Sequence, residues 1–363
     1  MTDRDTGVGV LLARATAAGL ACGWVAAALS EGEEGPYWVS GRRAIDGDEV
    51  RADLWYDLAS LTKPLVTATL LLLARRDGLE LATPLAELLG ELDGSPWGRV
   101  TLEQCATHTA GFPAWEPLYT AGTGAAAYLE RLAGIPPAAA PGERCVYSCL
   151  GFVALGLALE RAAGADIATL AEELLVEPLG LQGECGFAPG RGVEVAAGER
   201  EWWVEQGLLA ERGLAVAPPV GREDAWPCGD GNARGLGGAA GNAGLFGSAA
   251  AVARLAAEYL PGGGEILTAE EADLATRCRT AGLAQARGLG WQLASTPSCS
   301  AGPALSPEAF GHTGFSGVSV WVEPARRLVL VLLGNRLHPG GRTPDLHPLR
   351  RAFHRLARAE REG

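Results

Sequence analysis

Two side chains near residue 60 have the types and the spacing that nucleophilic catalysis needs. Ser60 and Lys63 stand just ahead of an apolar run that predicts a helix through Leu73. Residues three apart lie on one face of a helix, so the Lys63 amine can reach the Ser60 hydroxyl and take its proton. The helix N-terminus also favours the negative charge that develops in acyl transfer. The alternative is a serine that caps the helix beside a solvated lysine.

The residues around this pair extend the pattern. Residues 56–64 read Tyr-Asp-Leu-Ala-Ser-Leu-Thr-Lys-Pro. This resembles the Phe-Asp-x-Ala-Ser-x-Thr-Lys signature of serine β-lactamases, penicillin-binding proteins and related esterases. The resemblance implies a class C β-lactamase-related serine hydrolase or esterase. Ser60 would be its nucleophile, and Lys63 would handle the proton.

A second segment resembles the family's Pro-Gly-x-x-x-x-Tyr-Ser-Asn loop. Residues 141–149 read Pro-Gly-Glu-Arg-Cys-Val-Tyr-Ser-Cys, so the resemblance implies that Tyr147 is the general base. A tyrosine with an unperturbed pKa of about 10 is a poor base at neutral pH. The role therefore requires a neighbouring cation, which Lys63 would supply.

A third segment, His312-Thr313-Gly314, precedes the last predicted hairpin and resembles the family's Lys-Thr-Gly strand. The resemblance implies that these residues bind substrate. It also implies an oxyanion hole formed by the backbone N–H groups of Ser60 and Phe315. Residues 107–113 resemble a family turn as well, in which His108 would be architectural.

Two positions depart from the family pattern. Cys149 stands where the family usually has Asn, and a thiol is a weak donor that cannot bridge substrate and lysine. His312 replaces Lys and should carry a fractional charge near neutral pH, so it would anchor a substrate carboxylate weakly. Asn242, in a glycine-rich segment that also resembles the family, could restore a substrate-binding amide. These departures favour a carboxylic ester, or a small amide without a free carboxylate, as the substrate.

Two other functions stay open. One is a cytoplasmic peptidase or carboxypeptidase that acts on D-amino-acid or muropeptide substrates. The other is a binding protein that keeps the fold but has weak catalysis, as Cys149 suggests. We expect no metal and no cofactor, because no zinc motif occurs and the glycines at 235–240 lack the preceding strand of a dinucleotide site.

The predicted elements form an α+β fold. Residues 8–18 predict a helix, 24–29 and 37–40 a hairpin with a turn at 31–36, and 318–323 and 328–333 a second hairpin before a helix at 345–361. We expect an αβα sandwich whose mainly antiparallel sheet is built from both termini, residues 1–78 and 246–363, carrying Ser60, Lys63 and His312. A mostly helical domain, residues 79–245, is inserted and carries Tyr147. Residues 229–247 predict a long ordered loop.

Composition limits the possible partners. The net charge of −13, from 43 acidic and 30 basic residues, disfavours nucleic-acid binding. The apolar stretch at 15–29 is too short to span a bilayer, so we expect no membrane association and a cytoplasmic protein, with periplasm or secretion as the minority alternative. The expected partner is a small-molecule ester, amide or peptide, and the oligomeric state is not indicated. The eight scattered cysteines predict mostly buried thiols.

Overall fold

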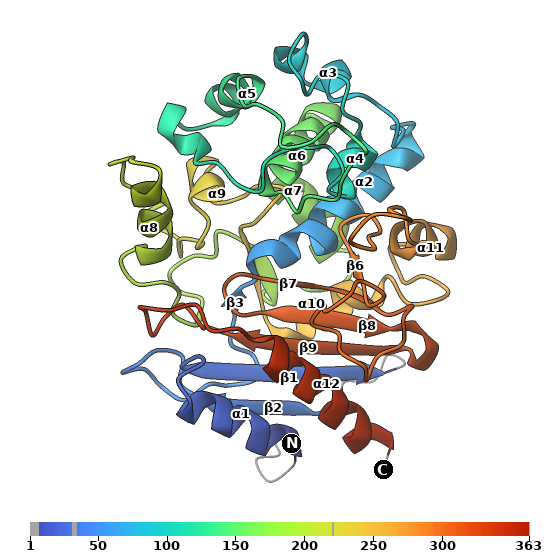
Figure 1. Ribbon diagram of the computed structural model, residues 1–363. Helices are drawn as coiled ribbons and strands as arrows, with labels where there is room; N and C mark the ends of the chain where they lie inside the picture. Colours follow the sequence, from blue (N-terminus) through green and yellow to red (C-terminus); the bar gives the residue numbers. More distant parts are fainter. Residues whose placement is uncertain (1–6, 31–34, 220, 363) are drawn as a thin grey trace.

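A computed structural model describes residues 7–30, 35–219 and 221–362, and its centre is a large antiparallel sheet. The strand order is β2-β1-β9-β8-β7-β6. The strands are β1 (Gly23–Ser30), β2 (Tyr37–Gly41), β6 (Gln292–Leu293), β7 (Phe310–Thr313), β8 (Ser319–Glu323) and β9 (Leu328–Gly334). Strands β1 and β9 pair along their length, from Trp24↔Gly334 to Ser30↔Leu328. The two ends of the chain therefore build the sheet together (Figure 1).

Strand β9 is buried on both faces, as its unbroken apolar run predicts. Successive side chains of a strand point to opposite faces, so the run divides between two cores. Leu328, Leu330 and Leu332 pack under α1 (Gly7–Ala17) and α12 (His347–Glu362). The alternate residues of β9 pack in the core that also contains α10 (Ala249–Ala257). Helices therefore cover both faces of the sheet (Figure 1).

The other α-helices lie above β7 in Figure 1, with α11 beside β6. They are α2 (Thr69–Ala74), α3 (Leu85–Leu88), α4 (Leu102–Ala106), α5 (Ala125–Ala133), α6 (Cys149–Ala163), α7 (Ile167–Ala171), α8 (Trp203–Glu211), α9 (Gly231–Gly235) and α11 (Ala269–Thr276). A small sheet of order β3-β5-β4 comprises β3 (Tyr56–Asp57), β4 (Cys185–Phe187) and β5 (Leu245–Gly247). Because β3 ends just before Ser60, its pairing with β5 brings the end of the glycine-rich segment beside the Ser60 turn.

The predicted α+β class is confirmed, with an antiparallel sheet from both termini between layers of helices. The domain boundaries at 78/79 and 245/246 stay a prediction, and β5 spans the second of them. Part of the predicted turn, residues 31–34, lies outside the described residues. The loop predicted at 229–247 is wrong in detail, since it contains α9 and all of β5. Asp230 begins α9 by accepting the Ala233 N–H at 2.8 Å.

All eight cysteines lie in the described segments, and all are free thiols. Four are buried, three are partly buried, and Cys278 is exposed. Within residues 7–30, 35–219 and 221–362, no helix combines the length and apolar character needed to cross a bilayer.

Candidate active site

Ser60 lies in a tight turn with a strained backbone. The turn is a short 3₁₀ segment, Ala59–Leu61, and Ala59 has a φ of 46°, in the left-handed region that a Cβ disfavours. The Ala59 N–H donates to Asp57 Oδ1 at 2.8 Å, and the Gly229 N–H donates to Asp57 Oδ2 at 2.6 Å. Asp57 therefore ties the turn to the glycine-rich segment. The half-buried Ser60 side chain faces a cavity.

Lys63 follows one turn later, and its side chain is completely buried. Its Nζ donates to Ser60 Oγ at 2.9 Å and to the main-chain oxygen of Asn242 at 2.9 Å. The Sγ of Cys149 lies 3.5 Å from the same nitrogen. The helix here is a π-helix, Lys63–Ala68, and not the regular helix that the sequence predicts. Such π turns recur at functional sites.

Tyr147 reaches the same point from the loop before α6. Its side chain lies beside Ser60 and Lys63, and Lys63 Nζ lies 5.2 Å from the centre of its ring. His108 holds this loop, since its carbonyl accepts the Val146 N–H at 2.9 Å and its Nδ1 accepts the Ser148 N–H at 3.1 Å. Burial, helped by Arg287 and Lys63, lowers the pKa of His108 well below its usual value. The neutral ring can therefore accept that bond, which fits the architectural role predicted for it.

Strand β7 and the turn after it form the opposite wall. His312 and Thr313 lie on β7, and Gly314 packs directly against the Ser60 turn. A Cβ at Gly314 would lie 2.4 Å from Val318 Cγ2 and 2.9 Å from the Leu58 carbonyl oxygen, so glycine is needed for this contact. The Ser316 hydroxyl donates to the Asp57 carbonyl at 2.7 Å. Residues 314 and 316 thus pack against the turn that carries Ser60, while the oxyanion hole formed by the N–H groups of Ser60 and Phe315 stays a prediction.

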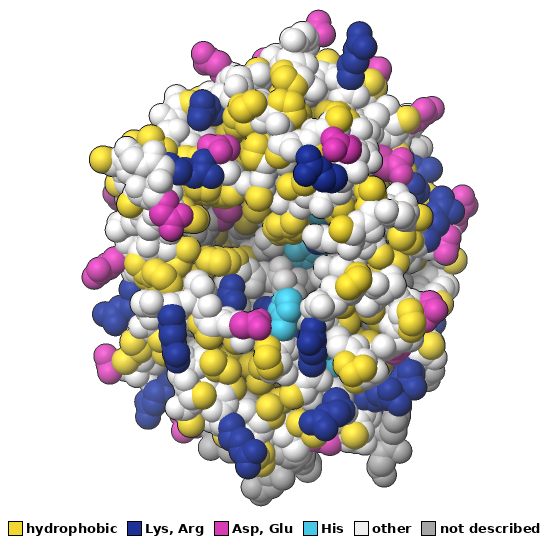
Figure 2. Space-filling view, in the orientation of Figure 1, with side chains coloured by type: hydrophobic (Ala, Val, Ile, Leu, Met, Phe, Trp, Pro, Cys, Tyr) yellow, Lys and Arg dark blue, Asp and Glu magenta, His cyan; other side chains and the backbone are white. Residues whose placement is uncertain are grey.

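These groups surround a cavity of about 550 Å³. Figure 2 shows it as a hollow in the middle of one face, between the sheet and the upper helices. Of the residues that the sequence singles out, those on its wall are Ser60, Tyr147, Cys149, His312, Thr313, Gly314 and Phe315. Lys63 and Asn242 lie buried behind this wall. The volume suits a small-molecule substrate.

The family model described as Beta-lactamase matches residues 15–354. The chain belongs to the beta-lactamase family. Proteins of this family are serine hydrolases, so the family assignment made from the motifs is confirmed.

Solved structures show where the beta-lactamase fold of this chain recurs. EstCE1, described as a hydrolase with promiscuous acyltransferase activity, has a TM-score of 0.75 and 20% identity, covering 96% of this chain and 97% of its own. A penicillin-binding protein homologue from Caulobacter crescentus has a TM-score of 0.73 and 21% identity, covering 98% and 96%. These likenesses show the fold.

A curated relative is named putative D-alanyl-D-alanine carboxypeptidase, from Salmonella agona (strain SL483). It is 28% identical over 262 residues, which cover 66% of this chain and 58% of that protein. The chain therefore spans less than two thirds of the length of the curated relatives it matches.

The structure corrects two expectations drawn from the beta-lactamase motifs. Burial, then Arg287 and Lys63, lowers the pKa of His312 well below its usual value, so this imidazole is neutral rather than fractionally charged at neutral pH. Its Nδ1 donates to the Thr313 carbonyl at 2.9 Å. The Asn242 amide does not face the cavity; it is completely buried and donates to Asp230 Oδ2 at 3.0 Å. Asn242 contributes its main-chain oxygen instead.

Glycines explain how Asn242 reaches Lys63. A Cβ at Gly241 would lie 2.2 Å from the Phe152 carbonyl oxygen and 2.8 Å from the Gly156 Cα, so the segment passes α6 at backbone contact distance. The Thr67 hydroxyl donates to the Gly241 carbonyl at 2.7 Å. The glycine-rich segment is therefore held between the Lys63 helix and α6, with the next carbonyl aimed at the ammonium.

The protonation states of Lys63 and Tyr147 determine whether this pair can accept a proton from Ser60. Burial lowers the pKa of Lys63, but the ionised forms of Cys149 and Tyr147, together with Asp230, raise it by more, so the pKa lies above its ordinary value. Burial also raises the pKa of Tyr147, against the opposing charge of Lys63. At neutral pH the pair holds an ammonium and a phenol. It must lose one proton before it can take the proton of Ser60, so reactivity should rise toward alkaline pH.

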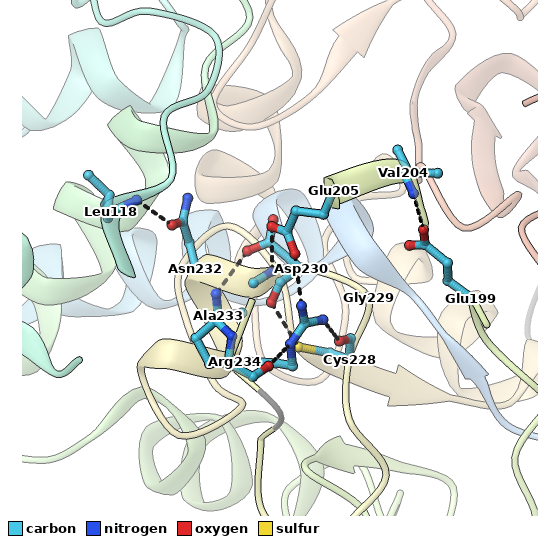
Figure 3. A network of polar contacts seen from close by, with 12 residues as sticks. Leu118, Glu199, Val204, Glu205, Cys228, Gly229, Asp230, Asn232, Ala233 and Arg234 are labelled. Carbon is cyan, nitrogen blue, oxygen red and sulfur yellow. Dashed lines mark hydrogen bonds and ion pairs between the residues drawn. The ribbon is translucent and has the colours of Figure 1, made fainter. Parts of the chain in front are cut away.

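A buried polar network lies beside these residues (Figure 3). The Nη2 of Arg234, on α9, donates to Glu205 Oε2, on α8, at 2.8 Å, and the Arg234 side chain is 0% exposed. Its Nη1 donates to the Cys228 carbonyl at 2.7 Å. Burial and then the charge of Asp230 raise the pKa of Glu205 to about 7, against the lowering effect of Arg234. Because Glu205 lines the cavity, this network holds α8 in place as part of the wall.

The sequence prediction missed Asp57, Asp230 and Arg287. Arg287 is 4% exposed, lines the cavity, and lies 5.5 Å from the centre of the Tyr147 ring. Asp57 stands two residues before the amide that it binds, and Asp230 three before, which are the spacings of local side-chain caps. Asp57 and Asp230 could therefore have been predicted from the sequence as cap residues. No sequence motif near Arg287 indicates a role in the site. Arg287 reaches the site through its antiparallel pairing with Gln292, which the sequence does not predict.

Proposed function

We propose that the chain hydrolyses a carboxylic ester or a small amide through an acyl-enzyme on Ser60. The observation that carries the proposal is the contact of Ser60 Oγ with Lys63 Nζ at 2.9 Å, beside the Tyr147 hydroxyl, on the wall of a cavity of about 550 Å³. A nucleophile, its proton acceptors and a substrate space thus coincide. The neutral His312 favours substrates without a free carboxylate. The cytoplasmic location stays a prediction.

Each step of the proposed reaction uses a group of this site. The Ser60 oxygen attacks the substrate carbonyl carbon while its proton passes to the deprotonated Lys63–Tyr147 pair. The backbone N–H groups of Ser60 and Phe315 hold the oxyanion. The bond to the leaving group then breaks, and the pair returns the proton to the departing alcohol or amine. Water adds to the acyl-enzyme by the same sequence, and Ser60 recovers its proton as the carboxylic acid leaves.

Covalent trapping tests this proposal. An alkyl fluorophosphonate should add one phosphonyl group to Ser60 with loss of fluoride, so intact-mass measurement should show one adduct on the wild type and none on Ser60→Ala. Ser295→Ala, which removes an exposed serine outside the cavity, should label as the wild type does. An unlabelled but folded wild type would instead identify a binding protein that retains the fold.

A second candidate, a peptidase for substrates that end in a carboxylate, is favoured by Arg287. Its Nε and Nη2 donate to Gln285 Oε1 at 3.1 and 2.7 Å. Among the described residues, Nη1 has no oxygen or nitrogen partner, and its neighbour is the Cys145 thiol. Burial lowers the pKa of Arg287, but a guanidinium stays charged at neutral pH. A buried, incompletely paired cation on the cavity wall could hold a carboxylate.

Arg287→Gln separates the two candidates. If the substrate is an ester without a carboxylate, the variant should hydrolyse p-nitrophenyl butyrate within about threefold of the wild type, and a D-Ala-D-Ala peptide should be a poor substrate for both. If the peptidase is correct, kcat/KM for the peptide should fall about 10- to 100-fold in the variant, the usual cost of a lost charged hydrogen bond. Ester hydrolysis would then be unaffected. Steady-state kinetics with both substrates decide between these outcomes.

A further inference from the structure

Asp230 is connected to the catalytic lysine through a single residue. Its Oδ2 accepts the Asn242 side-chain amide at 3.0 Å, while its Oδ1 accepts the Ala233 N–H at 2.8 Å. The main-chain oxygen of the same Asn242 accepts from Lys63 Nζ at 2.9 Å. One carboxylate oxygen of Asp230 is thus bonded to the start of α9. The other oxygen is bonded to Asn242, whose main-chain oxygen accepts the hydrogen bond of the Lys63 ammonium.

The Asn242 side chain has few other restraints. It lies near the Cys149 thiol, which is at most a weak hydrogen-bond partner, and its Oδ1 is buried without a partner among the described residues. The bond to Asp230 is therefore its strongest side-chain restraint. Without the bond to Asp230, the position of the Asn242 main chain would depend only on the packing and hydrogen bonds of the adjacent residues.

Asp230 also contributes charge. The ammonium of Lys63 has no carboxylate within ion-pair distance in the described part of the chain, although it is completely buried. Asp230 is the carboxylate that acts on it, and it does so across Asn242. A negative charge near a buried ammonium stabilises the protonated form.

We propose that Asp230 is a positioning residue for the catalytic lysine: it fixes Asn242 so that its main-chain oxygen accepts the hydrogen bond of the Lys63 ammonium, and it holds a negative charge on the other side of Asn242 from that ammonium. The part of this inference that concerns reaction rate rests on the proposed function. The part that concerns the charge of Lys63 does not.

Other ionisable groups surround these two residues. Those that act on Lys63 or are acted on by it are Tyr147, Cys149, His108 and His312. The charge of Asp230 raises the pKa of six neighbouring groups, and Arg234 is the nearby cation that opposes this effect on most of them. The six groups are Asp57, Glu205, Tyr119, Tyr128, Cys149 and Cys228. The pKa of Glu205 is about 7, so Glu205 is largely ionised before the pH reaches the alkaline range in which Lys63 titrates. The titration of Glu205 therefore does not overlap that of Lys63.

The composition of the chain allows a direct test, because Lys63 is its single lysine. Protein labelled with ¹³C-lysine should give one Lys Cε resonance, and its titration reports the charge of Lys63 without any substrate. In Asp230→Asn the midpoint should fall by about one pH unit, since the stabilising charge is lost. Asp166→Asn is the matched control, because Asp166 caps α7 by the same 2.8 Å bond and does not line the cavity.

The exchange variant Asp230→Asn/Asn242→Asp re-forms the hydrogen bond in reverse and keeps one carboxylate, so its midpoint should return to the wild-type value or above it. The limiting rate of fluorophosphonate labelling at high pH should fall about tenfold in Asp230→Asn, the pH at which the rate begins to rise should be lower, and both should recover in the exchange variant. An unchanged Lys63 midpoint in Asp230→Asn overturns the proposal. If that variant does not fold, Asp230→Ser, which keeps the cap of α9, replaces it. A wild type that takes no label refutes the proposed function, while the Lys63 resonance still decides the role of Asp230.

Discussion

Replacing Lys63 by methionine should lower the rate of Ser60 acylation by about 10²- to 10⁴-fold, the range that general acid–base groups supply. Methionine fills a similar space, but it cannot accept a proton from Ser60 Oγ, which lies 2.9 Å from Lys63 Nζ and which the proposed reaction requires to lose its proton. The measurement is the rate constant for fluorophosphonate labelling, or for p-nitrophenyl ester hydrolysis, at several pH values. The alkaline rise should also disappear from the profile of the variant, because the titrating pair is gone.

Tyr147→Phe should cost a similar factor, and the double variant little more than either single one. The charges of Lys63 and Tyr147 shift each other's pKa, and in the proposed reaction both side chains share the proton of Ser60, so they should act as a unit, and losses in such units are strongly non-additive. Fully additive losses would show that lysine and tyrosine act in separate steps.

A structural control accompanies these variants. The buried Lys63 has no carboxylate within ion-pair distance among the described residues, so its charge is expensive to bury. Lys63→Met should therefore leave the free energy of unfolding within about 2 kcal/mol of the wild type, since the charge removed offsets the hydrogen bonds lost. A large loss of stability with an intact labelling rate per folded molecule would make Lys63 a structural residue.

Local spacing explains what the sequence could predict of this site. The Ser60–Lys63 contact follows from helical geometry, and the doubly buried β9 follows from its unbroken apolar run. Tyr147 is far from Ser60 in the sequence, and its place was predicted from a family resemblance rather than from spacing. One compositional signal was available: among 30 basic residues there is a single lysine, and it follows Ser60 by one turn.

The neutrality of His312 and the buried amide of Asn242 could not be predicted, because both depend on burial and on distant partners. His312 is held neutral by burial and by Arg287, which joins the site through pairing next to β6. Asn242 faces away from the cavity because Asp230, in a helical turn that was predicted as loop, takes its amide. A motif predicts which residues meet, but the charge and direction of each side chain depend on what the rest of the fold packs around it.

Arg234→Met should destabilise the protein by about 3–5 kcal/mol at pH 8, the usual cost of removing one partner from a buried ion pair. The Arg234 and Glu205 side chains are 0% and 8% exposed, so water cannot replace the lost partner. The variant also loses the Nη1 donor to the Cys228 carbonyl and the contact of Arg234 with the Trp202 ring at 3.8 Å. Urea unfolding measures the loss. Arg222→Met, which breaks an exposed pair with side chains 56% and 70% exposed, should change stability by less than about 1 kcal/mol.

The loss of stability in Arg234→Met should depend on pH, and the protonation of Glu205 determines the direction of this dependence. Its pKa is raised from 4.5 to about 7, so the folded protein holds this proton more tightly than the unfolded chain, and the resulting stability is lost as the pH rises through 7. Without Arg234 the lowering effect on this pKa is removed, so the ionised carboxyl becomes harder to bury. Arg234→Met should therefore cost less at pH 5.5, where Glu205 is protonated, than at pH 8. Adding Glu205→Gln should recover part of the loss at pH 8 and little at pH 5.5; equal costs at both pH values would mean that Arg234 stabilises the fold by packing and not by charge.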